Sequence, residues 1–158
     1  MRIGRLAVDA GKGAVAGAAG TAAITVSQMM EAKIRGREPS TSAAQAVENV
    51  LDVEPRYDKA EQRLNTVAHF GYGTAWGIPR GLLAAFGLGP VPATLLHFLG
   101  VQGAAMAVVP ATTESPPVTE WPRREIAVET LHHIVYATVA GAVFSWLTRS
   151  ERRANEPT

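Results

Sequence analysis

The sequence predicts an all-α integral membrane protein built as a four-helix bundle. Three observations predict this fold: the charged residues are gathered into short clusters, long windows between them carry no Asp, Glu, Lys or Arg, and those windows are rich in Gly and Ala. A helix facing water needs a polar stripe every turn or two, whereas about 20 mostly apolar residues cross a bilayer. The 158 residues are enough for a single membrane domain.

The charge-free windows set the expected spans and the loops between them. We expect spans over about residues 13–30, 64–88, 91–109 and 126–147, with a polar loop at 31–63 and a Pro-rich loop at 110–125. Pro79 is expected to kink the second span, and Arg80 to snorkel, to pair with an acid or to mark the edge of that span. Pro110 is expected to end the third span.

The first span has a rival interpretation as a secretory signal peptide, because it follows Arg2 and Arg5 and has a small-residue core. The apolar segment has no Leu-rich centre and continues unbroken to Glu31, which favours a span. Lys and Arg do not settle the orientation of the protein. The short, basic termini favour a cytoplasmic position for both ends.

The polar loop contains a short helical pattern. Ser42 and Gln45 have the spacing of a capping box. The apolar residues that follow fall on one face, which predicts an amphipathic helix at the membrane interface or over the mouth of the bundle. These residues are Ala43, Ala46, Val47, Val50 and Leu51.

Two stretches of the chain resemble each other. The pattern H-x-x-Y-x-T-x-x-G begins at His69 and again at His133, at the start of the second and fourth spans. One interpretation is a pair of related helix hairpins; the other is chance recurrence of small residues. The same regions contain small residues four apart, which let helix backbones approach closely in lipid. The expected packing residues are Gly13, Gly17, Gly73, Gly77 and Gly141.

Alternating spans bring four helix ends to one mouth of the bundle, and polar residues gather at those ends. Ionisable groups at membrane depth are costly, and His titrates near neutrality, so such a cluster is a candidate proton- or ion-linked site. The alternative is that these side chains are simply solvated at the headgroup level. The candidate site comprises Glu31, His69, Tyr72, Glu129, His132, His133 and Tyr136.

Metal and cofactor chemistry has little support in the sequence. No cysteine is present, which excludes thiolate catalysis and Cys-bound metals. His69 and His133 are expected at matching depth, so haem ligation or a His/Glu metal site stays open as an alternative, while His97 is expected in the other half of the membrane. His132 and His133, adjacent on a helix, point in different directions and are a poor chelating pair. We predict no metal site.

Several function classes are excluded or unsupported. The chain has no G-x-S-x-G or H-E-x-x-H motif and no Gly-rich loop after a strand, so no enzyme is predicted. A net charge of +1 gives no reason to expect nucleic acid. The expected partners are the lipid bilayer and either other membrane-protein subunits or further copies of this chain.

From the second span onward, over residues 64–153, the sequence resembles the YagU-like inner-membrane proteins, a family of uncharacterised function. The resemblance is carried by His69, His97, the loop from Ser115 to Pro122, Glu129 with a following His, and the arginine-rich tail from Arg149. It implies a multi-pass protein of the bacterial inner membrane and supplies no catalytic residues.

Three functional hypotheses follow. The first is a small non-enzymatic membrane protein that is an accessory or structural subunit of a larger complex. The second is a proton- or ion-linked transporter or pH-responsive protein using the His and Glu residues of the mouth. The third is a haem- or quinone-binding redox subunit.

Overall fold

The computed structural model describes residues 3–38 and 40–154, and the side chains of residues 3–38 and 40–150. Arg2 and Pro39, and the side chains of Arg152 and Arg153, lie outside this description. The described chain is all-helical and contains no strand, which confirms the all-α part of the predicted fold class; the four-helix membrane bundle stays a prediction. Its elements are α1 (Ile3–Arg35), α2 (Ser42–Leu51), α3 (Asp58–Ala85), α4 (Pro90–Thr112), the 3-10 helix η1 (Val118–Glu120) and α5 (Arg123–Ala154).

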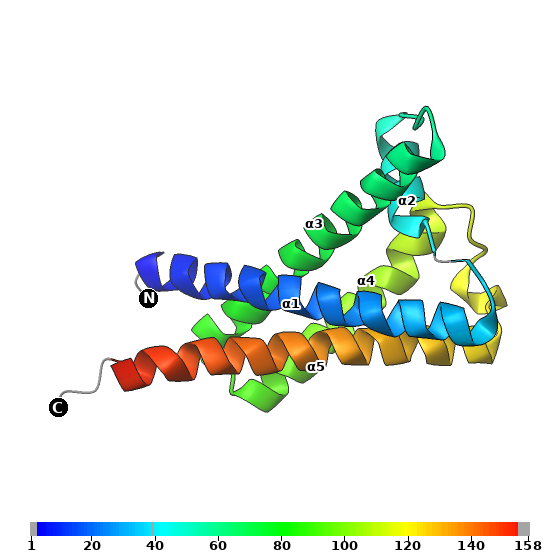
Figure 1. Cartoon of the computed structure of the whole chain (residues 1–158). Coiled ribbons are helices and arrows are strands. Elements are labelled where there is room, and N and C mark those ends of the chain that lie inside the picture. Colours follow the sequence, from blue (N-terminus) through cyan, green and yellow to red (C-terminus); the bar gives the residue numbers. More distant parts are fainter. Residues whose placement is uncertain (1–2, 39, 155–158) are drawn as a thin grey trace.

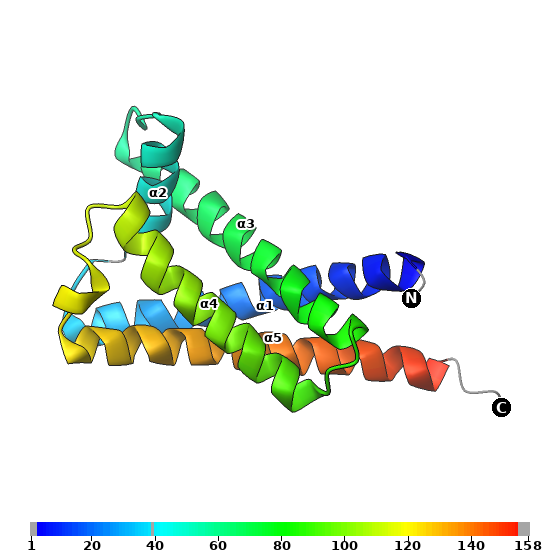
Figure 2. The same cartoon turned by 180° about the vertical axis from the view of Figure 1, so that it is seen from behind.

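The four long helices alternate in direction (Figure 1). α1 and α5 lie side by side and antiparallel, α3 crosses α1 at an angle, and α4 crosses α5 at an angle; the view from behind shows the same arrangement (Figure 2). α1 ends, α3 begins, α4 ends and α5 begins at one end of the molecule, which we call the mouth end. Both chain termini lie at the opposite end, the terminal end.

The contact between α1 and α3 depends on glycine. A Cβ built on Gly17 would lie 2.8 Å from the Gly77 Cα, and one built on Gly77 would lie 2.6 Å from the Gly17 Cα. Cβ atoms built on Gly13 and Gly73 would meet the Gly77 backbone and the Thr21 side chain. Backbones this close are what small residues four apart allow.

The interior is built from small and polar side chains, and the large apolar side chains face outward. Most buried hydrophobic residues are alanines, and the buried polar residues include Arg80, Gln102 and three histidines. A water-soluble protein has the opposite distribution. The large hydrophobic residues exposed on the four long helices include Val15, Val26, Met30, Val67, Ile78, Leu95, Leu99, Leu131, Ile134 and Trp146.

Two helices are long and apolar enough to cross a membrane: α4, and α5 over Arg123–Ser150. Only 22% and 33% of their most apolar windows are buried, so neither resembles the covered central helix of a soluble protein. α1 and α3 do not pass the same test of length and composition.

Two local expectations were wrong, and the expected short helix in the polar loop is present as α2. Pro110 does not end its helix, because α4 continues to Thr112. Thr41, not Ser42, is the N-cap of α2, and Gln45 bonds back to the Thr41 hydroxyl at 3.4 Å. The buried residue of α2 is Ala44, whose N–H donates to Asn65 of α3, while Val50 and Leu51 are exposed.

Candidate functional site

A set of polar side chains runs lengthwise between the helices and forms the candidate site. We call this set the polar column. Measured along α5 from Glu129 to Phe144, the column extends about 22 Å, at 1.5 Å per helical residue. Its members are Ser27 and Thr25 of α1, His69 and Arg80 of α3, His97 and Gln102 of α4, and Glu129, Thr130, His132, His133 and Tyr136 of α5.

The part of the column between α4 and α5 is a directed chain of hydrogen bonds. The Thr130 hydroxyl donates to the Ile126 carbonyl at 2.7 Å, so its oxygen accepts from the Gln102 amide nitrogen at 3.3 Å. That orientation turns the Gln102 amide oxygen toward Nδ1 of His133 at 2.9 Å. Because an amide oxygen only accepts, His133 Nδ1 carries a hydrogen.

Two histidines reach across to α1. His132 Nδ1 lies 2.8 Å from the Ser27 hydroxyl, and its other nitrogen, Nε2, is buried with no hydrogen-bond partner. His69 Nε2 lies 3.2 Å from Thr25 Oγ1, whose own hydrogen goes to the Thr21 carbonyl at 2.7 Å. His69 therefore donates to Thr25. His132 and His133 bond to different helices, which agrees with their expected divergence.

His97 and Tyr136 continue the column into the middle of the bundle. His97 Nε2 donates to the Trp76 carbonyl at 2.9 Å, which leaves Nδ1 as a buried nitrogen without a partner. The Tyr136 hydroxyl donates to the Gly73 carbonyl at 2.5 Å. The rings of His97 and Tyr136 lie 5.5 Å apart, and Gly20 leaves room for the tyrosine ring against α1.

Arg80 closes the column toward the terminal end. Its side chain is 1% exposed, and its guanidinium lies over the Phe144 ring at 4.7 Å. Nε and Nη1 are buried without a hydrogen-bond partner among the described residues. Snorkelling does not describe this side chain, because helices enclose it, and no acid among the described residues pairs with it; that Arg80 marks the edge of the second span stays a prediction.

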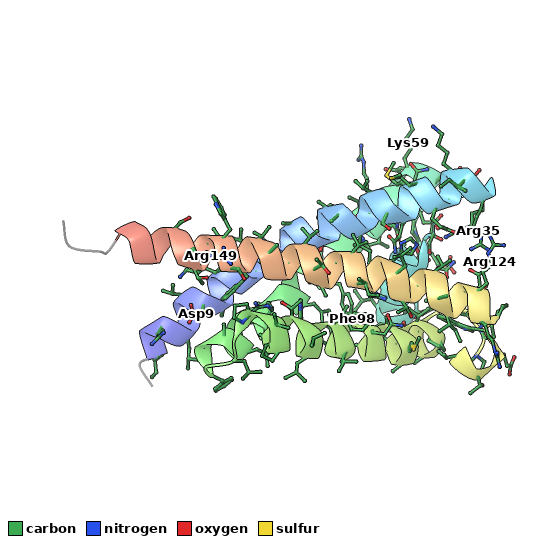
Figure 3. All side chains as sticks on the ribbon, turned by 90° about the horizontal axis from the view of Figure 1, so that it is seen from below. Asp9, Arg35, Lys59, Phe98, Arg124 and Arg149 are labelled. Carbon is green, nitrogen blue, oxygen red and sulfur yellow. The ribbon has the colours of Figure 1, made fainter. Side chains whose placement is uncertain are left out.

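Charged side chains at the mouth end form a separate network between α1 and α5. Arg35 donates to Glu31 at 2.8 Å and to Glu125 at 2.9 Å, and Arg37 also donates to Glu31. The hydrogen bond from Arg37, together with Arg35, holds the pKa of the Glu31 carboxyl below its ordinary value. Arg35 and Arg124 mark this end in Figure 3, while Asp9 and Arg149 mark the terminal end.

The structure brings together most, though not all, of the predicted site. Glu129, His132, His133 and Tyr136 share one region of α5, and His69 faces it from α3. Glu31 lies in the surface network, 14% exposed, and bonds to arginines. Tyr72 was placed in the cluster wrongly: it is 48% exposed and packs edge-on against Trp76, 6.2 Å between ring centroids.

Sequence reasoning missed part of the column. His97 was expected at another depth, yet its ring contacts Tyr136, because α4 returns obliquely along α5. Gln102, Ser27 and Thr25 were not assigned to the site. The available signal was polarity within charge-free windows, since a polar side chain in an apolar helix needs a partner. Arg80 carried the same signal more strongly.

The described residues contain no group of three or more His, Asp or Glu side chains placed to hold a metal ion. Each histidine nitrogen with an assigned partner bonds to an oxygen of the chain itself. The haem alternative remains a prediction that a spectrum of the purified protein tests.

Comparison with known proteins gives no relative from which a function could be proposed. No protein-family model, curated protein or solved structure matches the chain. The resemblance to YagU-like proteins therefore stays a prediction, and the function is argued from the side chains alone.

Proposed function

We propose that this chain is a proton-linked transporter of the bacterial inner membrane, with its four long helices in the bilayer and the polar column as the route of the proton. One observation carries the proposal: a column of hydrogen-bonding side chains extends along the inside of a bundle whose outside is apolar.

The distribution of side chains supports the membrane setting. The polar interior and apolar exterior match a solvent that is itself apolar. Charged residues collect at both ends of the bundle, with Arg35 and Arg124 at one and Asp9 and Arg149 at the other (Figure 3). Only Arg80 and Glu129 are charged residues within the proposed spans, and both belong to the column.

The hydrogen bonds support the proton link. In neutral His97 and His69 the hydrogen is on Nε2, and in neutral His133 it is on Nδ1, so each ring offers its other nitrogen to a proton. His97 Nδ1 and His132 Nε2 are buried and have no partner. The His97 nitrogen carries a lone pair, because Nε2 of the same ring donates to a carbonyl, and a buried lone pair without a donor is an energetic cost that proton uptake or a water molecule relieves.

Proton flux into liposomes tests the proposal. Purified protein is reconstituted with a pH-sensitive dye inside the vesicles, and an imposed pH gradient drives the flux. We expect the His97→Gln variant, whose amide still donates to the Trp76 carbonyl, to lose flux by about tenfold or more because its nitrogen is no longer a base.

The matched control is Tyr72→Phe, which removes a hydroxyl from a side chain outside the column. We expect its flux to equal that of the unchanged protein. Flux no greater than in protein-free vesicles would contradict the proposal, and so would equal flux from the His97→Gln protein.

The hypothesis of an accessory subunit stays a second proposal. It rests on the glycine-rich helix faces and the lack of a complete catalytic motif, and Gly13, Gly17, Gly73 and Gly77 lie at the contact of α1 with α3 within the chain. Its test is the mass of the particle extracted in a mild detergent: co-elution with other subunits supports it. A Soret band in the same material supports the haem alternative.

A further inference from the structure

Arg80 is a buried cation with no anion beside it among the described residues. The residue is 1% exposed, and two of its three guanidinium nitrogens are buried without a hydrogen-bond partner in the part of the chain that the structure describes. An isolated buried charge costs several kcal/mol or more, and a chain ordinarily pairs it or neutralises it. A guanidinium is not deprotonated in proteins, so Arg80 cannot become neutral by losing a proton.

Asp9, an acid on the adjacent helix α1, already forms ion pairs with two other residues. Gly81, next to Arg80, packs on the backbone oxygen of Asp9. The Asp9 carboxylate lies 4.0 Å from Arg5 and 3.8 Å from Lys12, so its charge is shared with two other cations. Glu31 and Glu125, bound to arginines at the mouth end, are no better placed as partners. The charge of Arg80 therefore needs an anion that the described chain does not supply.

The residues around Arg80 fix the position of its side chain but do not neutralise its charge. Its guanidinium carbon lies over the Phe144 ring, 4.7 Å from the ring centroid, and Phe144 packs with Ala16 and Ala140, with Ala84 alongside. Stacking on an aromatic face fixes a guanidinium and leaves its N–H donors free for a ligand. Arg80 lies five residues before the end of α3, about 8 Å along the helix from the terminal end.

The nearest free acceptor of the column is one helical turn away. Trp76, four residues before Arg80, accepts the hydrogen bond from His97, and His97 Nδ1 is the buried nitrogen without a partner. A proton on that nitrogen and an anion on Arg80 would lie within the same turn of α3. Opposite charges so placed attract strongly in a low-dielectric interior, so binding of one favours the other.

From these contacts we infer that Arg80 is the binding site of a small oxyanion, entering from the terminal end, and that the anion is the substrate carried with the proton. The transport part of this inference rests on the proposed function; the binding part does not. The ligand class follows from the chemistry of the site: a delocalised cation with free N–H donors recognises carboxylate or phosphate oxygens.

Thermal unfolding of the purified full chain in a neutral maltoside detergent tests the binding. The probes are sodium acetate and sodium phosphate, each compared at equal ionic strength with a bulky sulfonate buffer. We expect at least one probe to raise the unfolding temperature of the unchanged protein by about 4 °C. The Arg80→Met variant should lose this rise and, without a probe, should unfold at a higher temperature than the unchanged protein, because an uncompensated charge has been removed.

Two further variants complete the design. Arg80→Lys keeps the charge and should keep part of the rise, and Arg149→Gln removes an exposed arginine at the same end and should keep all of it. The inference is overturned if neither probe stabilises the unchanged protein, or if Arg80→Met responds as the unchanged protein does. It is also overturned if only phosphatidylglycerol has the effect, since Arg80 would then hold a lipid headgroup. Proton flux that stays absent when the binding anion is included in the liposome assay would contradict the proposed function and leave the site standing.

Discussion

At the scale of single residues, a few hydroxyl groups fix the donor and acceptor roles of their neighbours in the polar column, because each has only one available acceptor for its hydrogen. Thr130 must donate to the Ile126 carbonyl, which fixes the Gln102 amide and through it the hydrogen on His133. The same reasoning fixes His69 through Thr25. The column therefore has a defined neutral state, and a proton added to any of these rings changes a known set of bonds.

Gln102 is the residue on which this order depends most. Replacing Gln102 with Leu leaves the buried Nδ1–H of His133 without an acceptor, and we expect a loss of about 1–3 kcal/mol of stability. Thermal or denaturant unfolding in detergent measures the loss. The exposed Gln62→Leu on α3 is the matched control and should change stability by less than about 0.5 kcal/mol. Equal stability of the Gln102→Leu and unchanged proteins would show that the chain of bonds is not formed.

At the scale of elements, α1 and α3 are in contact at glycines, Gly17 on α1 and Gly77 on α3. Gly77→Ala places a methyl group against the Gly17 backbone, 2.6 Å from its Cα, and backbone cannot move aside as a flexible side chain can. We expect a loss of about 1–3 kcal/mol or more. Gly103→Ala on α4 is the control, because its Cβ meets nothing within 4 Å, and it should be neutral or stabilising by up to about 1 kcal/mol. Similar unfolding temperatures for the two variants would contradict the close contact.

The ends of α1 and α5 are joined by charge, so their contact should respond to acid. Glu31 lies just beyond the proposed first span, and the hydrogen bond from Arg37 lowers its pKa in the folded protein. Such a group stabilises the fold at pH values above its unfolded pKa and loses that contribution as the pH falls through the lower folded pKa. We expect stability to fall below about pH 4.5.

The dependence on Glu31 is measured by unfolding temperature between about pH 3 and pH 6. Glu31→Gln should flatten the acid side of the profile, whereas Glu120→Gln, an exposed residue of η1, should leave it as it is. A Glu31→Gln profile that follows the unchanged protein at every pH would assign the acid response to other carboxylates.

The long helices were predictable from the sequence because a stretch of about 20 residues with few charges can hardly form any other structure than a helix in a bilayer. Their ends were not: α1 begins at Ile3 and α3 at Asp58, since polar residues outside the apolar windows also form helix. The depth of His97 was not predictable either. It depends on how α4 crosses α5, and a crossing angle is set by packing that a single sequence does not display.

The repeated H-x-x-Y pattern shows the same limit. His69 and His133 both join the column, but Tyr136 is buried on Gly20 while Tyr72 is half exposed beside Trp76. Equal spacing places two residues on equivalent faces of their own helices. Which of those faces meets another helix is a property of the bundle, so the pattern predicted both histidines and Tyr136 correctly but placed Tyr72 wrongly.

At the scale of the whole molecule, the apolar exterior predicts that all four long helices cross the bilayer, although only α4 and α5 are apolar enough to be recognised by composition. In α1 and α3 the faces turned toward other helices are made of Gly, Thr, His and Arg, which lowers the average while the outward faces stay apolar. An average over a helix misses this difference between faces.

Cysteine labelling tests the four crossings directly, because the chain has no cysteine of its own. With four crossings, Phe86→Cys and Ser150→Cys share the cytoplasmic side with the termini, and Lys59→Cys and Thr119→Cys share the other. A membrane-impermeant maleimide applied to spheroplasts should label the second pair at once and the first only after permeabilisation; Ala142→Cys, exposed in the middle of the last span, is the unlabelled control. Labelling of Lys59→Cys and Phe86→Cys from one side would leave α3 outside the bilayer, and the polar column would then end in water.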